Sequence, residues 1–102
     1  MQIINELEEH IDEEICDAKT YAELALKYKS DKTDLADLYI ELAMEEMQHM
    51  DKLHQQVVKI IGAYKKTNGE PPADMLAVYN YVHKKDIEKS KDVKMLIMMY
   101  NE

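Results

Sequence analysis

The sequence predicts an all-α protein, built as a long antiparallel helical hairpin followed by a C-terminal helix. Two observations predict this class. The two glycines and two prolines of the 102 residues all lie between Gly62 and Pro72, so the remainder holds no residue that interrupts a helix. Elsewhere, apolar residues recur in steps of three and four, the spacing that keeps one face of a helix apolar. At this length we expect a single domain, residues 1–102.

The expected helices cover residues 1–30, 34–63 and 72–100. The segment from Ser30 to Asp34 contains several helix-capping residues and little apolar content. A break this short makes the first two helices antiparallel neighbours. A loop at Asn68–Pro72 precedes the third helix, whose apolar face has one gap at Asp86. We expect this helix to cover the hairpin or to clasp a neighbouring subunit.

Two acidic residues and a histidine interrupt the apolar faces of the hairpin. The face of the first helix contains Leu7, Ile11, Glu14, Ala18, Tyr21, Leu24, Ala25 and Tyr28. The face of the second helix contains Leu35, Leu38, Leu42, Glu46, His49, Leu53, Val57 and Ile60. We expect both faces to point inward, where an ionised carboxylate or an imidazole is costly unless something pairs with it. A divalent metal ion is a natural partner.

The three polar residues should meet at one height of the hairpin. Counted from Lys32 in the turn, Glu14 lies 18 residues before it, and Glu46 and His49 lie 14 and 17 residues after it. At about 1.5 Å per residue, Glu14 and His49 are level within roughly 2 Å. The Glu-x-x-His spacing also places two ligands on adjacent turns, as in the di-metal sites of helical bundles. The sequence therefore predicts a metal site made of Glu14, Glu46 and His49.

This pattern resembles the ferritin-like superfamily of ferritins, bacterioferritins and rubrerythrins. The segment from Glu14 to Tyr21 is similar to the first-helix pattern of that superfamily, and the segment around Glu46 and His49 to its second-helix pattern, within residues 1–62. The resemblance implies that Glu14, Glu46 and His49 bind iron, with Glu46 as the bridging ligand. It also implies that Tyr21 supports catalysis by hydrogen-bonding a ligand carboxylate.

One chain supplies only half of such a site. Residues 68–102 contain no second Glu-x-x-His, whereas a ferritin-like chain normally has two helical pairs. Half-length members such as the encapsulated ferritins complete the site by pairing two chains, and this chain is similar to them, although no encapsulation-type tail follows Tyr100. The resemblance thus implies a homodimer or larger homo-oligomer, with a ferritin-like four-helix bundle completed by dimerisation.

The implied activity is that of a ferroxidase, in which dioxygen or peroxide oxidises bound Fe²⁺ for storage or detoxification. Oxygen-rich ligands with one imidazole per metal suit iron, and Mn²⁺ or Zn²⁺ could take its place. Two alternatives stay open. The same site could hold a structural metal that joins a helical dimer. In the other alternative, the three residues form a metal-free hydrogen-bonded network, and the chain is a helical scaffold or interaction module.

Charge and cysteine content argue against other classes of function. The net charge of −8 disfavours partners such as nucleic acids and anionic membranes. No apolar run approaches the roughly 20 residues that span a bilayer, and no signal peptide is visible. A single cysteine, Cys16, indicates a reducing, cytoplasmic compartment and no disulfide framework.

Several other polar residues have more ordinary expected roles. Asp51 and His54 repeat the Glu-x-x-His spacing with an aspartate, but His54 lies about 140° round the helix from His49, so we expect this pair to face solvent or a neighbouring chain. On the third helix, His83 and Glu88 lie on different faces and are weak ligand candidates. We expect the triplet-spaced methionines to pack flexibly in a core or an interface.

Overall fold

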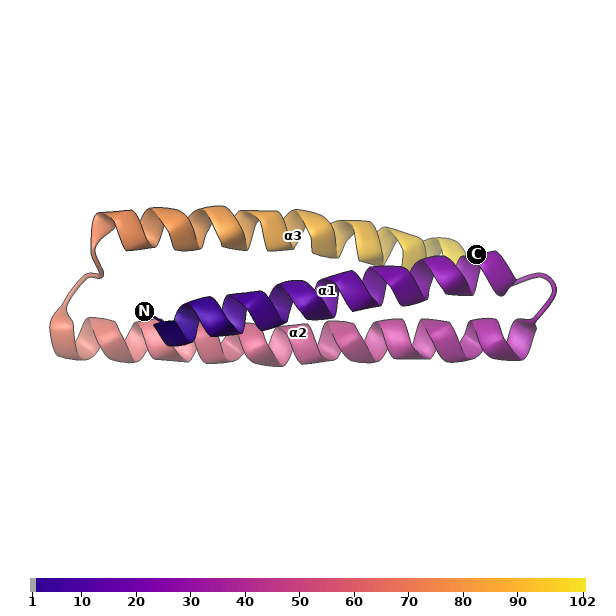
Figure 1. The fold of residues 1–102 in the computed structure, drawn as a ribbon, viewed down its shortest axis with the longest axis horizontal. Coiled ribbons are helices and arrows are strands. Elements are labelled where there is room, and N and C mark those ends of the chain that lie inside the picture. Colours follow the sequence, from indigo (N-terminus) through magenta and orange to yellow (C-terminus); the bar gives the residue numbers. More distant parts are fainter. Residues whose placement is uncertain (1) are drawn as a thin grey trace.

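The computed structural model describes residues 2–102, which form three long helices arranged up, down and up (Figure 1). These are α1 (Gln2–Tyr28), α2 (Thr33–Asn68) and α3 (Ala73–Asn101). Helices α1 and α3 run parallel to each other and antiparallel to α2, and the whole is a rod of 56 × 19 × 18 Å. The all-helical class predicted from the sequence is confirmed, and residues 2–102 contain no strand.

The helix ends follow from local sequence. The turn between α1 and α2 is closed by the Lys32 N–H, which donates to the Tyr28 carbonyl at 2.9 Å. Helix α2 continues through Gly62, beyond the end expected at residue 63, because one internal glycine costs only about 1 kcal/mol. It ends before Gly69, whose φ of 79° glycine adopts without strain. The Gly69 N–H donates to the Lys65 carbonyl at 3.0 Å.

Helix α1 lies against both other helices and supplies most of the core. Its buried residues repeat in steps of four and three: Ile4, Glu8, Ile11, Ile15, Ala18, Ala22 and Ala25. The alanines of this series, together with Ala36 and Ala43 of α2, are fully buried, and such small side chains let two helices approach closely. Helix α3 packs chiefly on α1 and touches α2 much less.

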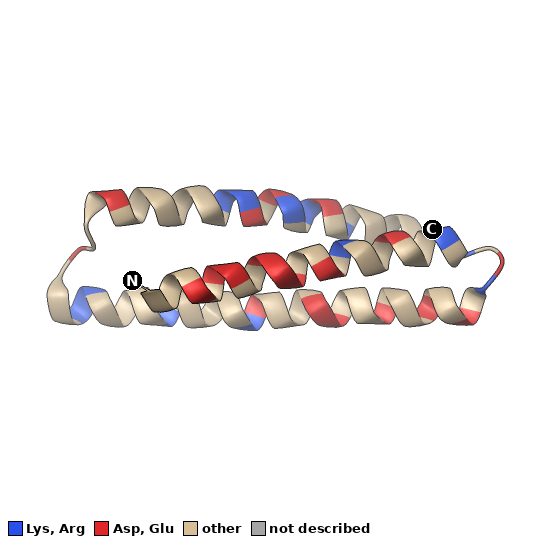
Figure 2. Cartoon of the chain, viewed as in Figure 1, with Lys and Arg blue, Asp and Glu red and all other residues tan. Residues whose placement is uncertain are grey.

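Polar contacts supplement the packing of α3. The Lys89 ammonium donates to Asp12 of α1 at 2.5 Å. Near the C-terminus, the Tyr100 hydroxyl donates to Asp37 of α2, while Val93 is fully buried in the core. Figure 2 shows the wider pattern, with acidic residues along the visible side of α1 and lysines grouped in the middle of α3. Acidic residues are interspersed among these lysines, and the Lys89–Asp12 ion pair is a contact of opposite charges between α3 and α1.

The apolar faces predicted from the sequence are rotated from the buried ones. In α1, Glu14 and Tyr21 lie beside the buried series and are partly exposed. In α2, Leu38 is 49% exposed and the His49 side chain is 53% exposed. The expectation that both faces point inward holds only in part for the single chain, since Ile11, Ala18, Ala25 and Val57 are buried whereas Leu38 and His49 are exposed. The partly or fully exposed members that lie together on one side of the hairpin are called the ligand face here: Glu14, Tyr21, Leu35, Leu38, Leu42, Glu46 and His49.

Within residues 2–102, no helix has an apolar stretch that is long enough and free enough of charges to cross a bilayer.

Candidate metal site

The structure brings Glu14, Glu46 and His49 together at one height of the hairpin. The Nδ1 atom of His49 lies 3.5 Å from Oε2 of Glu14 and 3.8 Å from Oε1 of Glu46. One potential ligand atom from each residue falls within 4.8 Å of the other two. Among residues 2–102, no other group of three or more Asp, Glu, His or Cys residues has its potential ligand atoms this close together. The convergence expected from helix spacing is thus present.

The burial of these side chains is graded. The Glu46 side chain is 19% exposed, Glu14 is 27% exposed and His49 is 53% exposed. Within the described residues, the Glu14 Oε2 atom is shielded from solvent and accepts no hydrogen bond. A shielded carboxylate oxygen without a donor costs free energy, since it has lost water and gained no partner. This oxygen therefore favours a positive partner, either a protonated His49, whose Nδ1 atom lies 3.5 Å away, or a bound cation.

A metal ion can serve as this positive partner. Carboxylate oxygens and imidazole nitrogens bind first-row divalent ions at about 2.0–2.2 Å. Two ligand atoms on one such ion are then about 3–4 Å apart, and the two measured separations lie within that interval. Because the His49 side chain is 53% exposed, one chain does not enclose the point where the three side chains meet.

Tyr21 lies on the same face as the three candidate ligands. It is seven residues beyond Glu14, or about two turns along α1. Its ring stacks on that of Tyr39 of α2, with the ring centroids 6.1 Å apart. Tyr39 in turn stacks on Tyr28 at 6.4 Å. The stacked rings of Tyr39 and Tyr28 thus hold Tyr21 beside the ligand face. The hydrogen bond from Tyr21 to a ligand carboxylate stays a prediction.

The ligand face points away from α3. Six residues turn a helix through about 600°, so Glu14 lies about 120° round α1 from Glu8, which faces α3. On α2, His49 lies about 140° round from His54, which stacks on His83 of α3 with ring centroids 4.7 Å apart. His54 thus packs against the chain's own third helix, and the expectation that it faces solvent or a neighbour is wrong. Glu88 is exposed on α3.

A second polar cluster, between α1 and α3, was missed by reasoning from the sequence. Glu8 and Asp86 are both buried, at 9% and 7% exposure, and face each other across the two helices. Burial and the adjacent Asp86 carboxylate raise the pKa of Glu8 to about 7. Burial raises the pKa of Asp86, opposed first by the hydrogen bond with Glu8 and then by Lys89 and His83. The signal for it was the gap at Asp86 in an otherwise apolar helix face.

Comparison of the chain with protein families, with curated proteins and with solved structures found no match.

Proposed function

We propose that this chain is a half-length ferritin-like protein that binds iron between two copies of itself and oxidises Fe²⁺. The observation that supports it most is the meeting of Glu14, Glu46 and His49 on facing helices, with one shielded Glu14 oxygen lacking a hydrogen bond. The donor set of two carboxylates and one imidazole suits Fe²⁺, with Mn²⁺ and Zn²⁺ as competitors.

The pairing of two chains is proposed because one ligand face holds half of a di-metal set. Di-iron carboxylate bundles use four carboxylates and two imidazoles, contributed by four helices. Two copies of this hairpin, related by a two-fold axis, supply that number from Glu14, Glu46 and His49. A two-fold contact brings the same patch of both chains together, so His49 of each copy can approach the ligands of the other.

The apolar part of the ligand face supports the same association. Leucines surround the candidate ligands on α2, and Leu38 is 49% exposed. Pairing would remove this surface from water, at about 25 cal/mol for each Å² buried. It would also shield the metal site and complete a four-helix bundle from two hairpins, with α3 of each chain on the outside.

The proposed reaction is the one that the ferritin-like resemblance implies, and the donor set is compatible with it. Dioxygen takes one electron from each of two Fe²⁺ ions and two protons, which gives two Fe³⁺ and hydrogen peroxide; with peroxide as oxidant, the same two electrons yield water. The carboxylates of Glu14 and Glu46 favour Fe³⁺ over Fe²⁺ because hard anionic oxygens stabilise the higher charge. The proposed role of Tyr21 is to orient one of these carboxylates. The exposed, single Cys16 fits the reducing cytoplasm, where Fe²⁺ is available.

The test is to purify the chain without an affinity tag from iron-supplemented cells and to measure iron per chain. About one ion per chain is expected if two chains share a di-iron site. Fe²⁺ is then added to metal-depleted protein without oxygen, and the near-ultraviolet absorbance of Fe³⁺ is followed after air is admitted. Bound metal without oxygen-dependent absorbance would support the structural-metal alternative. No bound metal would leave the helical scaffold.

A further inference from the structure

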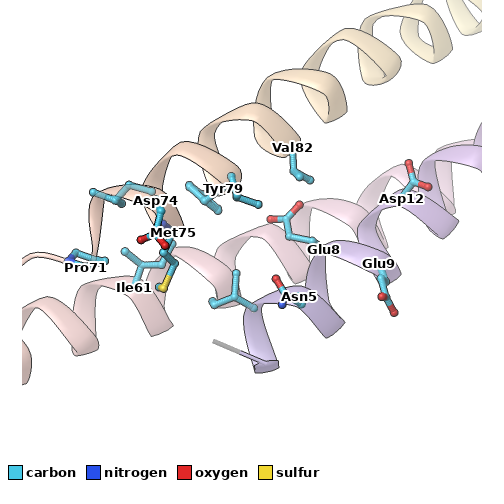
Figure 3. A pocket seen from close by; sticks show the side chains of 13 residues that line it. Asn5, Glu8, Glu9, Asp12, Ile61, Pro71, Asp74, Met75, Tyr79 and Val82 are labelled. Carbon is cyan, nitrogen blue, oxygen red and sulfur yellow. The ribbon is translucent and has the colours of Figure 1, made fainter.

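A cavity of about 610 Å³ opens between the start of α1, the end of α2 and the first turns of α3 (Figure 3). It lies where α3 has left the Gly69–Pro72 loop and before α3 settles on α1. Its volume falls within the roughly 300–1,000 Å³ typical of small-molecule sites. The candidate metal site is separate from it, since none of Glu14, Glu46 and His49 lines the cavity.

The lining of this cavity combines apolar walls with negative charge. Ile4, Ile61, Tyr79 and Val82 are among the apolar residues. The charged residues that line it are all acidic, and no Lys, Arg or His from residues 2–102 is among them. Such a lining favours a guest with an apolar body and a positive group.

Two of the four acidic residues already have partners. Asp12 accepts a hydrogen bond from Lys89, and Asp74 accepts one from the backbone N–H that follows it, at 3.0 Å. Glu9 is exposed, and in Figure 3 its carboxylate points away from Glu8. Glu8 is therefore the acidic residue of the lining that remains to bind a cation inside the cavity.

Glu8 is buried and faces the Asp86 carboxylate, to which it donates a hydrogen bond only when it is protonated. The residue is only 9% exposed, and within residues 2–102 neither of its carboxylate oxygens has a hydrogen-bond donor. In Figure 3 the carboxylate extends from α1 into the space beside Tyr79 and Val82. Asp86 faces it but cannot help when both are ionised, because a carboxylate only accepts hydrogen bonds. The cost of two buried negative charges is relieved by a proton or by a cation.

We propose that this cavity binds a small amphipathic organic cation, with its apolar body against Ile4, Ile61 and Tyr79 and its ammonium group on Glu8. An ammonium has three N–H donors, enough to satisfy both Glu8 oxygens and to reach toward Asp86. A bare divalent metal ion suits the site less well. It needs several converging donors, and the described residues bring three such donors together only at Glu14, Glu46 and His49.

The experiment uses three ligands of equal chain length: octylamine, 1-octanol and octanoate. Each is titrated into the full chain at pH 8, and binding is followed by calorimetry and by backbone amide NMR shifts. Octylamine should bind saturably and at least about tenfold more tightly than 1-octanol, with octanoate weakest, and shifts should gather around Ile4, Glu8 and Tyr79. Equal affinities for amine and alcohol would overturn the proposal.

Glu8→Gln and Glu9→Gln form a matched pair of variants, since each removes one carboxylate from adjacent positions. Glu8→Gln should abolish the tenfold preference for the amine and leave 1-octanol binding unchanged, whereas Glu9→Gln should keep the preference. Equal losses from both variants would mean that net charge alone attracts the amine. An amine that fails to bind, together with a lower oligomer mass in Glu8→Gln, would mean that a second chain covers the cavity, and would also overturn the proposal.

The pH dependence of the unmodified chain gives a test that needs no variant. Octylamine stays protonated below pH 9, as a lysine side chain does. Its affinity should rise severalfold between pH 6 and pH 8 as Glu8 loses its proton, while 1-octanol affinity stays constant. Besides Asp86, the groups that face Glu8 or Asp86 are Asp12, Tyr79, His83 and Lys89, together with His54 of α2. A flat profile for octylamine would contradict the proposed contact with Glu8.

Discussion

The imidazole of His49 lies 3.5 Å from the carboxylate of Glu14, although the two residues belong to different helices. Their approach joins the N-terminal half of α1 to the middle of α2, and Glu46 lies within reach of the same point. The distance is too long for a strong hydrogen bond and suits two ligands of one ion.

Replacing Glu46 with Ala should abolish binding of about one metal ion per chain, because it removes the candidate bridging carboxylate. Glu45→Ala is the matched control, since Glu45 is the preceding residue and is exposed off the ligand face. Glu88→Ala, on α3, is a second control, and both should leave the metal content almost intact. The readout is metal per chain after dialysis. Similar losses of bound metal from Glu46→Ala and Glu88→Ala would mean that the site has been placed on the wrong helix.

Removing metal should loosen the assembly. Without metal, two chains bring four carboxylates together, and metal that binds only the paired form stabilises it by about 2.7 kcal/mol at 100 times its Kd. Chelation should therefore lower both the mass seen by light scattering and the melting temperature. The Glu46→Ala variant, treated with the same chelator, should show neither change. Unchanged mass and melting temperature in the parent would argue against a shared site.

Tyr21→Phe should slow Fe²⁺ oxidation about tenfold while keeping the metal stoichiometry, because hydrogen bonds to ligands orient them without holding the ion. Phe retains the ring that stacks on Tyr39, so packing is preserved. Tyr39→Phe is the control and should oxidise Fe²⁺ at the parent rate. A rate for Tyr21→Phe within about twofold of the parent, or roughly 0.4 kcal/mol in barrier, would remove Tyr21 from the proposed mechanism.

The stability of the fold should fall as pH rises through neutrality, because of Glu8. Its pKa is about 7 in the folded chain, above its ordinary value of 4.5, so the folded state holds this proton more tightly than the unfolded state does. The contribution of this tighter proton binding to the free energy of unfolding is complete below pH 4.5 and is lost as pH rises through about 7. Glu8→Gln removes this ionisation and lets an amide N–H donate to Asp86.

In denaturant titrations, Glu8→Gln should therefore be more stable than the parent at pH 8, by on the order of 1 kcal/mol. At pH 5 the difference should shrink toward zero. Glu9→Gln, with an exposed carboxylate, should follow the parent at both pH values. A Glu8→Gln variant that is less stable than the parent at pH 8 would show that the ionised carboxylate is stabilised by a group other than those facing it here.

The sequence was enough to predict the helices and the height at which the ligands meet, because helix rise converts spacing into distance. It was not enough to predict which faces are buried. Leucines such as Leu38 suggested the core, yet Leu38 is 49% exposed, whereas Ala22, Ala36 and Ala43, which lie outside the predicted faces, are fully buried. Small side chains give a weak apolar signal, yet they permit the closest approach of two helices.

The pairing of Glu8 with Asp86 was beyond prediction for a different reason. The loop that precedes α3 fixes neither the rotation of this helix nor its height on α1, and only the finished packing sets them. A buried acidic residue on each of two helices then has no characteristic spacing along the chain. Candidate metal ligands on the two helices of a tight hairpin do have a characteristic spacing. For this reason the meeting of Glu14, Glu46 and His49 could be predicted.

The central place of α1 has a consequence for how the molecule opens. Because α3 packs chiefly on α1 and little on α2, α3 can separate as one unit while the hairpin and its three candidate ligands stay together. Amide hydrogen exchange should then be fastest in α3 and slowest in α1, whose buried residues run from Ile4 to Ala25. Protection factors in α3, which remove the intrinsic acceleration of exchange with pH, should also fall above pH 7, where Glu8 and Asp86 repel each other. Helix α3 would thus open and close independently of the hairpin formed by α1 and α2.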